Sequence, residues 1–549
     1  MKTGGQLIVD CLEANGVERI YSVPGESYLA VLDALHDSKI RNIICRQEGG
    51  AAMMADCEGR LTGKPGVCFV TRGPGATNAS AGIHIAQQDS NPMVLFVGQV
   101  ARGNLEREAF QEVDYKAFFG SMAKWVVEID DARRIPELVT RAFAVAASGR
   151  PGPVVVALPE DMLTDEVEAP APLPFVPVES NPSEDQIAEL VELLGKAKRP
   201  FVVLGGTRWT EETAREMCAA LTRWKLPAGC SFRRQALCDQ LHSCYAGDIG
   251  IGLNPKLGDY FKNSDLILLI GCRFGEMPSS DYTLLESPYP KQKLVHVYPD
   301  PAELGRVYRP TLAINATPEA FARAFGKTKP KSEPVWAANT EELHQSYLVW
   351  STPPKNGPGP VKMGPIMAWL EETLPEDVII ANGAGNFATW MHRFHRYRKF
   401  NTQAAPTSGS MGYGMPAGVA AKLIHPDRDV IVWAGDGDFM MHGQEFATAM
   451  QFGAPLVVVI LNNGIYGTIR MHQERDYPGR VSGTTLVNPD FAALARAYGG
   501  HGETVETTED FAPAYERARA AGKPAIIEVK LDPEAITPAR TLTDIREKR

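Results

Sequence analysis

Short runs of Val, Ile and Leu recur along the whole chain, and longer stretches with a helical spacing of apolar residues separate them. Strands that are apolar at nearly every position are typical of parallel sheets covered by helices on both faces. The pattern therefore predicts an α/β protein. The clearest strands are expected at residues 42–45, 67–71, 93–97, 154–158, 201–204, 266–270, 294–297, 378–381, 430–434 and 456–461.

The length of the chain and two proline-rich stretches predict three domains. A single hydrophobic core usually stops growing near ~250 residues, and this chain has 549. Residues 168–182 and 329–360 are rich in proline and lack apolar periodicity, so both are predicted to be linkers. We expect three doubly wound parallel-sheet domains, at residues 1–167, 183–328 and 361–549.

Composition excludes several classes of protein. The net charge of −10 is spread along the chain without a cluster of Lys and Arg, which speaks against a nucleic-acid partner. No apolar run approaches the ~20 residues that cross a bilayer, so no membrane span is expected. Nine cysteines without a C-x-x-C pair, and acidic residues where a signal peptide would be apolar, predict a cytoplasmic protein with reduced thiols.

The most informative segment runs from residue 433 to residue 463. One predicted strand ends in Gly435-Asp436-Gly437, a helical pattern follows, and a second predicted strand ends in Asn462-Asn463. Because consecutive parallel strands end on the same edge of a sheet, Asp436 and Asn463 are expected to meet there. Their oxygens suit a hard cation such as Mg²⁺ or Ca²⁺, and the glycines let a phosphate approach a helix N-terminus. Either motif alone is usually an ordinary turn.

Together, the two motifs resemble the signature of thiamine diphosphate enzymes, and the whole chain is similar to the acetohydroxyacid (acetolactate) synthase branch. The resemblance implies a pyrimidine-binding domain, a central Rossmann-like domain and a diphosphate-binding domain, in that order. It implies thiamine diphosphate and Mg²⁺ as cofactors, with Asp436, Asn463 and Ile465 as metal ligands. It also implies a homodimer or homotetramer with active sites at the subunit interface, because the family draws Glu48 and Asp436 from different subunits.

Glu48, in the segment ICRQEGG, is the second residue on which the resemblance rests. A glutamate in a first helical turn is also favoured by the helix dipole alone. The resemblance implies instead that Glu48 is the catalytic acid that activates the aminopyrimidine of the cofactor. It further implies that Gln111 and Lys124 lie along the substrate channel, although a solvated Lys124 remains an open alternative.

The segment SGSMGYGMPAG resembles the stretch that folds the cofactor into its V shape. The resemblance implies that Met411 lies beneath the thiazolium and that the Gly409 carbonyl holds the 4′-amine, whereas a plain core methionine is the alternative for Met411. The other residues to which the resemblance gives a cofactor-binding role are Gly25, Gly73, Asn78, Asn382, Gly383, Gly385, Asn386, Gly435, Asp436, Gly437, Asp438, Asn463, Ile465 and Tyr466.

Two departures from the synthase pattern bear on the substrate. Glu26, in VPGES, stands where the synthases have glycine and simple 2-oxo-acid decarboxylases have an acid, so it is a candidate catalytic proton relay. Those decarboxylases also use adjacent histidines, and this chain has no His-His pair. His472 stands where the biosynthetic synthases have a tryptophan that shapes the acceptor pocket, so it is a candidate for selecting the acceptor.

The sequence does not decide whether the central domain binds a nucleotide. Gly205-Gly206-Thr207 partly matches the flavin-binding glycines of the synthases, and Arg273 and Asp300 have recognisable counterparts, but the surrounding segments differ. FAD is one alternative, and a Rossmann-like domain without a nucleotide is the other.

We expect an enzyme that decarboxylates a 2-oxo acid and ligates the product to a second carbonyl compound; the alternative is a non-ligating decarboxylase that releases an aldehyde. A nicotinamide dehydrogenase is a weaker hypothesis, prompted by a G-x-G-x-x-A at residues 383–388. The dinucleotide-binding fingerprint includes an acidic residue about 20 positions after its glycines, and none occurs between Ala388 and Asp427. A non-catalytic relative would be expected to lose Glu48, Asp436 or Asn463, and all three are present.

Overall fold

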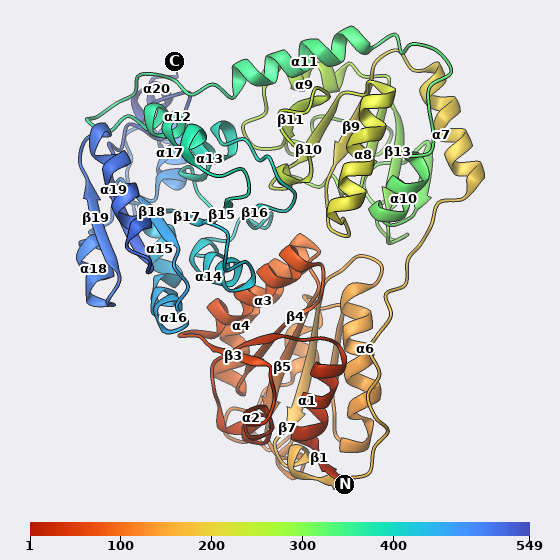
Figure 1. Ribbon diagram of the computed structural model, residues 1–549, viewed down its shortest axis with the longest axis vertical. Helices are drawn as coiled ribbons and strands as arrows, with labels where there is room; N and C mark the ends of the chain where they lie inside the picture. The colour runs from red at the N-terminus through yellow and green to blue at the C-terminus, as the bar shows by residue number, and fades with distance from the viewer. Residues whose placement is uncertain (549) are drawn as a thin grey trace.

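The structure is a computed structural model that describes residues 1–548. It contains three six-stranded parallel sheets, each flanked by helices, which form the N-terminal, central and C-terminal domains. In Figure 1 the N-terminal domain (red to orange) lies at the bottom, the central domain (yellow to green) at the upper right and the C-terminal domain (cyan to blue) at the left. The predicted fold class is confirmed. None of the described helices is long and apolar enough to cross a membrane.

The N-terminal sheet has the strand order β3-β2-β4-β5-β7-β6. Its strands are β2 (Arg19–Ser22), β3 (Arg41–Ile44), β4 (Gly66–Val70), β5 (Met93–Gln99), β6 (Trp125–Glu128) and β7 (Pro153–Pro159). Apolar residues of α1 (Gly4–Ala14), α2 (Leu29–His36) and α6 (Ile135–Ala147) cover one face, and those of α3 (Glu48–Thr62) and α4 (Gly73–Asp89) cover the other.

The C-terminal sheet repeats this topology. Its order is β16-β15-β17-β18-β20-β19, so in both sheets the strands run 2-1-3-4-6-5 when each is numbered from its own first strand. The strands are β15 (Ile379–Asn382), β16 (Gln403–Ala404), β17 (Val430–Gly435), β18 (Val457–Asn462), β19 (His501–Val505) and β20 (Ala525–Lys530). Helix α3 and its counterpart α14 (Gly414–Ile424) pack against each other and join the two domains in one apolar cluster (Figure 1).

The central sheet has a different order, β11-β10-β9-β12-β13-β14. Numbered from its first strand this is 3-2-1-4-5-6, the order of a Rossmann fold, as the resemblance implied. The strands are β9 (Pro200–Leu204), β10 (Ala228–Ser231), β11 (Tyr245–Ile249), β12 (Leu266–Ile270), β13 (Lys293–Tyr298) and β14 (Leu312–Asn315).

All ten strands predicted from the apolar runs are present, with ends within two residues of the prediction. The linker prediction for residues 329–360 is wrong in its middle part, where α11 (Ala337–Trp350) forms. Its prolines lie on both sides of this helix, and the stretch between them has none. The helix packs on β11, where the Tyr347 and Tyr245 rings meet edge to face with centroids 4.8 Å apart.

Candidate active site

A cavity of about 240 Å³ lies in the C-terminal domain, at the carboxyl ends of β15, β17 and β18. In the order 2-1-3-4-6-5 the chain reverses direction across the sheet between β15 and β17, and open α/β sheets bind ligands at such a switch point. The predicted cofactor-binding residues that line this cavity are Gly385, Asn386, Gly409, Met411, Gly435, Asp436, Gly437, Asp438, Asn463, Ile465 and Tyr466.

Asp436 is a buried carboxyl group that lines this cavity. Its Oδ2 accepts hydrogen bonds from the Gly464 backbone at 2.9 Å and from Asn488 Nδ2 at 2.7 Å, and its Oδ1 accepts one from the Gly437 backbone. Burial raises the pKa of Asp436, and the groups that oppose this are all hydrogen-bond donors, with no cation among the described residues. A buried carboxylate of this kind is well suited to a bound cation, and the nearby Asn463 and Ile465 add oxygen atoms.

Asp438 links two segments near this cavity through hydrogen bonds to their backbone. Its Oδ1 accepts hydrogen bonds from the backbone of Ala384 at 3.2 Å and of Gly412 at 2.9 Å, and burial raises the pKa of this carboxyl to about 7. A Cβ on Gly383 would lie 2.0 Å from the same oxygen, so this approach requires glycine. Asn382, the last residue of β15, is fully buried, and its Oδ1 has no hydrogen-bond partner among residues 1–548.

Glu48 begins α3 in the N-terminal domain. Its Oε2 accepts a hydrogen bond from Asn78 Nδ2 at 2.9 Å. The first turn of α3 is held from the C-terminal domain, because Glu445 Oε1 accepts from the backbone of Arg46 at 3.1 Å and of Gln47 at 3.0 Å. The carboxylate is half-buried and does not line the 240 Å³ cavity of its own chain.

The other predicted residues of the N-terminal domain lie at the carboxyl ends of β2 and β4. A Cβ on Gly25 would lie 2.3 Å from the Thr71 side chain, and the Gly73 backbone donates to the Gln111 carbonyl at 2.9 Å. Glu26 forms an ion pair with Arg72. None of Gly25, Glu26, Gly73, Asn78 and Gln111 lines the C-terminal cavity. Lys124 lies apart from them and donates to the Ser148 carbonyl at 2.7 Å, just beyond the end of α6.

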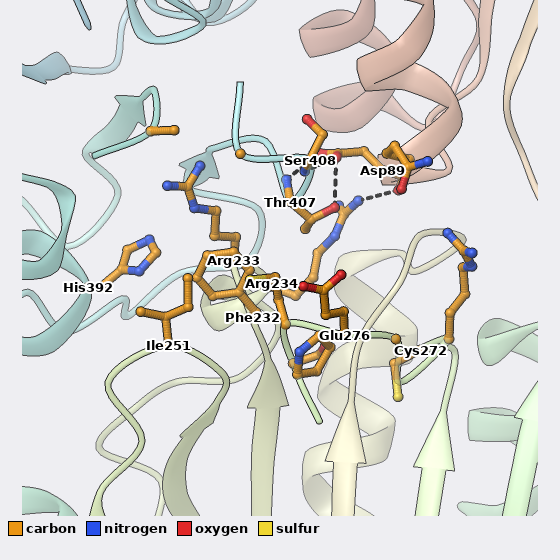
Figure 2. Close-up of a pocket in the computed structure, with 18 of the residues that line it drawn as sticks. Asp89, Phe232, Arg233, Arg234, Ile251, Cys272, Glu276, His392, Thr407 and Ser408 are labelled. Atoms are coloured by element: carbon orange, nitrogen blue, oxygen red, sulfur yellow. Dashed lines mark hydrogen bonds between the residues drawn. The ribbon is translucent and has the colours of Figure 1, made fainter. Parts of the chain in front are cut away.

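A larger cavity of about 780 Å³ lies where the three domains meet. Figure 2 shows Asp89 of the N-terminal domain, Phe232 and Cys272 of the central domain and Thr407 of the C-terminal domain around it. His472 also lines this cavity, and its Nδ1 has no partner in the described part of the chain. The two cavities adjoin, because the following residues line both: Ala384, Gly385, Asn386, Gly409 and Thr468.

The central domain contributes the loops after β9 and β12 to this larger cavity. A Cβ on Gly206 (φ +71°) would lie 1.7 Å from the Gly271 carbonyl oxygen, so the two loops touch at the switch point of the Rossmann sheet. Arg273 lines the cavity and pairs with Glu303 at 3.2 Å. Asp300 is not part of the lining; its Oδ1 accepts from the Ala302 backbone at 2.9 Å.

Three residues of the site were missed from the sequence. Asn488 bonds to Asp436, but it lies in a segment without secondary structure and carries no motif. Arg233 and His392 line the larger cavity as buried polar side chains. The only signal for Arg233 in the sequence is the pair of adjacent arginines in the segment SFRRQ, because the strand before it, AGCS, carries no apolar pattern.

Comparison with known proteins agrees with this geometry. Family models described as the N-terminal TPP binding domain, the central domain and the C-terminal TPP binding domain of thiamine pyrophosphate enzymes match residues 2–118, 187–325 and 383–529. The acetolactate synthase isozyme 2 large subunit of Escherichia coli (strain K12) is 30% identical, over 96% of this chain and 95% of that protein.

Two further relatives are similar over the same extent. The acetolactate synthase large subunit of Haemophilus influenzae is 31% identical, over 96% of this chain and 94% of its own. The acetolactate synthase large subunit of Corynebacterium glutamicum is 32% identical, over 96% of this chain and 86% of its own. With matching domains in the same order and similarity along nearly the whole length, the chain belongs to the thiamine pyrophosphate (thiamine diphosphate) enzymes.

Proposed function

We propose that the protein decarboxylates a 2-oxo acid and ligates the remaining fragment to a second carbonyl compound, as an acetolactate synthase-like carboligase. The observation that carries this proposal is the Asp436 cavity at the switch point, combined with similarity to acetolactate synthases along nearly the whole chain. When bound, thiamine diphosphate supplies the electron sink for the decarboxylation. The chain supplies the residues that hold the cofactor and a cavity of about 780 Å³ beside it.

We propose that Mg²⁺ joins the diphosphate to the chain through Asp436, the Asn463 side-chain oxygen and the Ile465 carbonyl. These residues would offer Mg²⁺ oxygen ligands of the kind it prefers, and the ion would offset the negative charge of the diphosphate. The buried carboxylate without a cationic partner among the described residues supports this role.

We propose that Glu48 acts on the cofactor of a second subunit, with Gly25, Gly73, Asn78 and Gln111 around it. The absence of these residues from the lining of the C-terminal cavity of the same chain supports this arrangement. Exposed apolar side chains next to both groups support it as well: Phe110 is 74% exposed and Met440 is 51% exposed. A homodimer would cover such surface, and a homotetramer would pair two dimers.

FAD in the central domain remains a second candidate cofactor. The contact between Gly206 and Gly271 beside a cavity of about 780 Å³ favours a nucleotide. The departures of the neighbouring segments from the synthase pattern favour a domain without one. The visible absorption spectrum of the purified protein distinguishes the two, since bound flavin absorbs there and thiamine diphosphate does not.

Simple decarboxylation is the alternative to ligation, with Glu26 as the proton relay. The ion pair of Glu26 with Arg72 gives this carboxylate a structural task, and the relatives named above are synthases. Ligation is therefore the function that we propose. We also propose a cytoplasmic location, which nine free cysteine thiols support.

Proton NMR of pyruvate incubated with the protein, thiamine diphosphate and Mg²⁺ tests the proposal, with Glu48→Gln as the matched control. Acetolactate formed by the wild type alone supports ligation. Acetaldehyde as the main product would contradict ligation and support the decarboxylase alternative. Consumption of pyruvate by Glu48→Gln at the wild-type rate would contradict the role of Glu48.

A further inference from the structure

Two cysteines of the central domain lie in direct contact, away from both cavities. Cys218 Sγ and Cys238 Sγ are 3.1 Å apart. Cys218 belongs to α8 (Glu211–Trp224), and Cys238 directly follows the single helical turn Gln235–Leu237 between β10 and β11. Neither residue lines the 240 Å³ or the 780 Å³ cavity. Because a disulfide bond is about 2.05 Å long, an approach of about 1 Å would join the two sulfurs.

The two thiols of this pair differ in their access to solvent. Cys218 is partly exposed, whereas Cys238 is only 5% exposed. The hydrogen bond with Cys218, together with burial, raises the pKa of the Cys238 thiol well above its usual range, so Cys238 keeps its proton. Thiol–disulfide exchange begins at an accessible thiolate. Cys218 is therefore the sulfur that a dissolved oxidant reaches first, and Cys238 is the sulfur beside it that can complete the reaction.

Two other cysteines lie near this pair but do not contact it. Cys230 and Cys244 are buried, and each is close enough to Cys218 for their charges to interact. The Cys244 thiol donates to the Leu221 carbonyl at 3.6 Å instead. No other hydrogen bond within residues 1–548 joins two cysteines. Of the thiols gathered between residues 218 and 244, Cys218 and Cys238 are thus the two that are placed to react with each other.

The segment that follows Cys238 joins the central domain to the C-terminal domain. Asp239 pairs with Arg398 at 2.8 Å. The Gln240 backbone donates to the Tyr397 carbonyl at 3.1 Å, and Gln240 Oε1 accepts from the Tyr397 backbone at 3.0 Å. On the other side of the pair, the apolar face of α8 packs in the core of the central domain. A covalent bond between the two sulfurs would therefore anchor this domain contact to that core.

We propose that Cys218 and Cys238 are a redox modification site, at which a low-molecular-weight disulfide oxidises both thiols to a disulfide that fixes residues 238–240 to α8. The Cys218 thiolate attacks one sulfur of the oxidant, which releases one thiol and leaves a mixed disulfide. Cys238 then attacks the Cys218 sulfur, and the second thiol leaves. The two cysteines lose two electrons, the oxidant gains them, and the two protons pass to the released thiols.

The reaction uses neither thiamine diphosphate nor a 2-oxo acid, so it is separate from the proposed ligation. In a reducing compartment such a pair stays reduced and forms a disulfide only transiently.

The test is a redox titration of the full-length protein with glutathione. Reduced protein is equilibrated with mixtures of reduced and oxidised glutathione, quenched with acid and alkylated, and its peptides are analysed by mass spectrometry. A disulfide between Cys218 and Cys238 is expected to increase with the fraction of oxidised glutathione and to disappear on treatment with dithiothreitol. Absence of this disulfide at the most oxidising ratio overturns the proposal. Glutathione that stays attached to Cys218 also overturns it, because Cys238 would then not complete the exchange.

Cys244→Ser is the matched control, because it removes another buried thiol near Cys218 without touching the pair. This variant is expected to form the disulfide at the same glutathione ratio as the wild type. Cys238→Ser is expected to stop at the mixed disulfide of Cys218 with glutathione. A disulfide that joins Cys218 to Cys230 or Cys244 in the wild type would contradict the assignment of Cys238.

Hydrogen exchange measures whether the disulfide anchors the domain contact, and it needs no turnover. The backbone amides of residues 238–240 are expected to exchange at least about tenfold more slowly in the oxidised wild type than in the reduced wild type, because a cross-link restricts the open states. Cys238→Ser treated with the same glutathione mixtures is expected to show no such difference. Equal exchange rates in oxidised and reduced wild type overturn the anchoring role, whether or not the enzyme ligates pyruvate.

Discussion

The side-chain amide of Asn78 donates a hydrogen bond to Glu48 Oε2 at 2.9 Å and so ties the first turn of α3 to α4. A Cβ on Gly75 would lie 3.4 Å from the other oxygen of the same carboxylate, so Glu48 lies close to the first turn of α4. Glu445 of the C-terminal domain holds the backbone just before it. Asn78 thus holds the Glu48 carboxylate, and Glu445 of another domain holds the backbone before it, which is the kind of support that a catalytic group requires.

Glu48→Gln is expected to remove activity while it preserves the fold. Glutamine keeps an oxygen that accepts the Asn78 hydrogen bond, but it cannot exchange a proton with the cofactor. Turnover is expected to fall by about 10²-fold or more, while thiamine diphosphate affinity, measured by calorimetry, stays near the wild-type value. Asn78→Ala keeps the Glu48 carboxylate but removes its hydrogen bond. This variant is expected to lower turnover by less than Glu48→Gln does. Glu48→Gln with wild-type turnover would contradict the role.

Asp436→Ala is expected to abolish Mg²⁺-dependent binding of thiamine diphosphate, because it removes the charged oxygen ligand. Asn488→Ala is the control, since it removes only the 2.7 Å hydrogen bond to Asp436. That variant is expected to weaken affinity by roughly tenfold, as changes behind a metal ligand do. Titrations with thiamine diphosphate at several Mg²⁺ concentrations measure both effects. Normal affinity in Asp436→Ala would refute the metal role.

Asp56 makes the stability of the interface between α3 and α14 depend on pH. It is fully buried, it accepts hydrogen bonds from Tyr413 at 2.7 Å and from Asn91 at 2.9 Å, and burial raises its pKa to about 7. The folded state therefore holds this proton at pH values where the unfolded chain has lost it. Stability is expected to fall by about 2 to 3 kcal/mol between pH 5 and pH 8.

Thermal unfolding of Asp56→Asn at both pH values measures this effect. Asparagine keeps a hydrogen-bonding group toward Tyr413 and Asn91 but carries no titrating proton. The variant is expected to be more stable than the wild type at pH 8. Its stability is expected to differ much less between pH 5 and pH 8 than that of the wild type. An identical pH dependence in wild type and variant would show that Asp56 is not its source.

His472→Trp is expected to narrow the range of acceptors. His472 lines the 780 Å³ cavity through α17 (Gly467–Asp476), and a larger ring there leaves less room beside the 240 Å³ cavity that contains Asp436. Discrimination against an acceptor that is one methylene longer is expected to rise by about tenfold. Competition between pyruvate and 2-oxobutyrate measures this as a product ratio. Unaltered ratios would mean that His472 does not contact the acceptor.

Much of the fold could be predicted because its signals are local. Buried parallel strands are apolar along their length, so β4, β5, β7, β12 and β18 stand out in the sequence. Short strands with few branched residues, such as β10 with the sequence AGCS, carry no such signal and were missed. The helix α11 was missed because the prolines on both sides of it hid a helical stretch of 14 residues.

The amino-acid sequence by itself determined the class of fold and which polar groups meet at the carboxyl ends of β17 and β18. The Gly435-Asp436-Gly437 and Asn462-Asn463 motifs directly follow strands, and neighbouring parallel strands must bring them to one edge. Only the tertiary structure decided how the remaining polar groups pair. Asp89 accepts from Thr407, 318 positions away, and Arg60 of α3 pairs with the same carboxylate. Such pairing depends on how three domains pack together, and no local pattern along the chain encodes it.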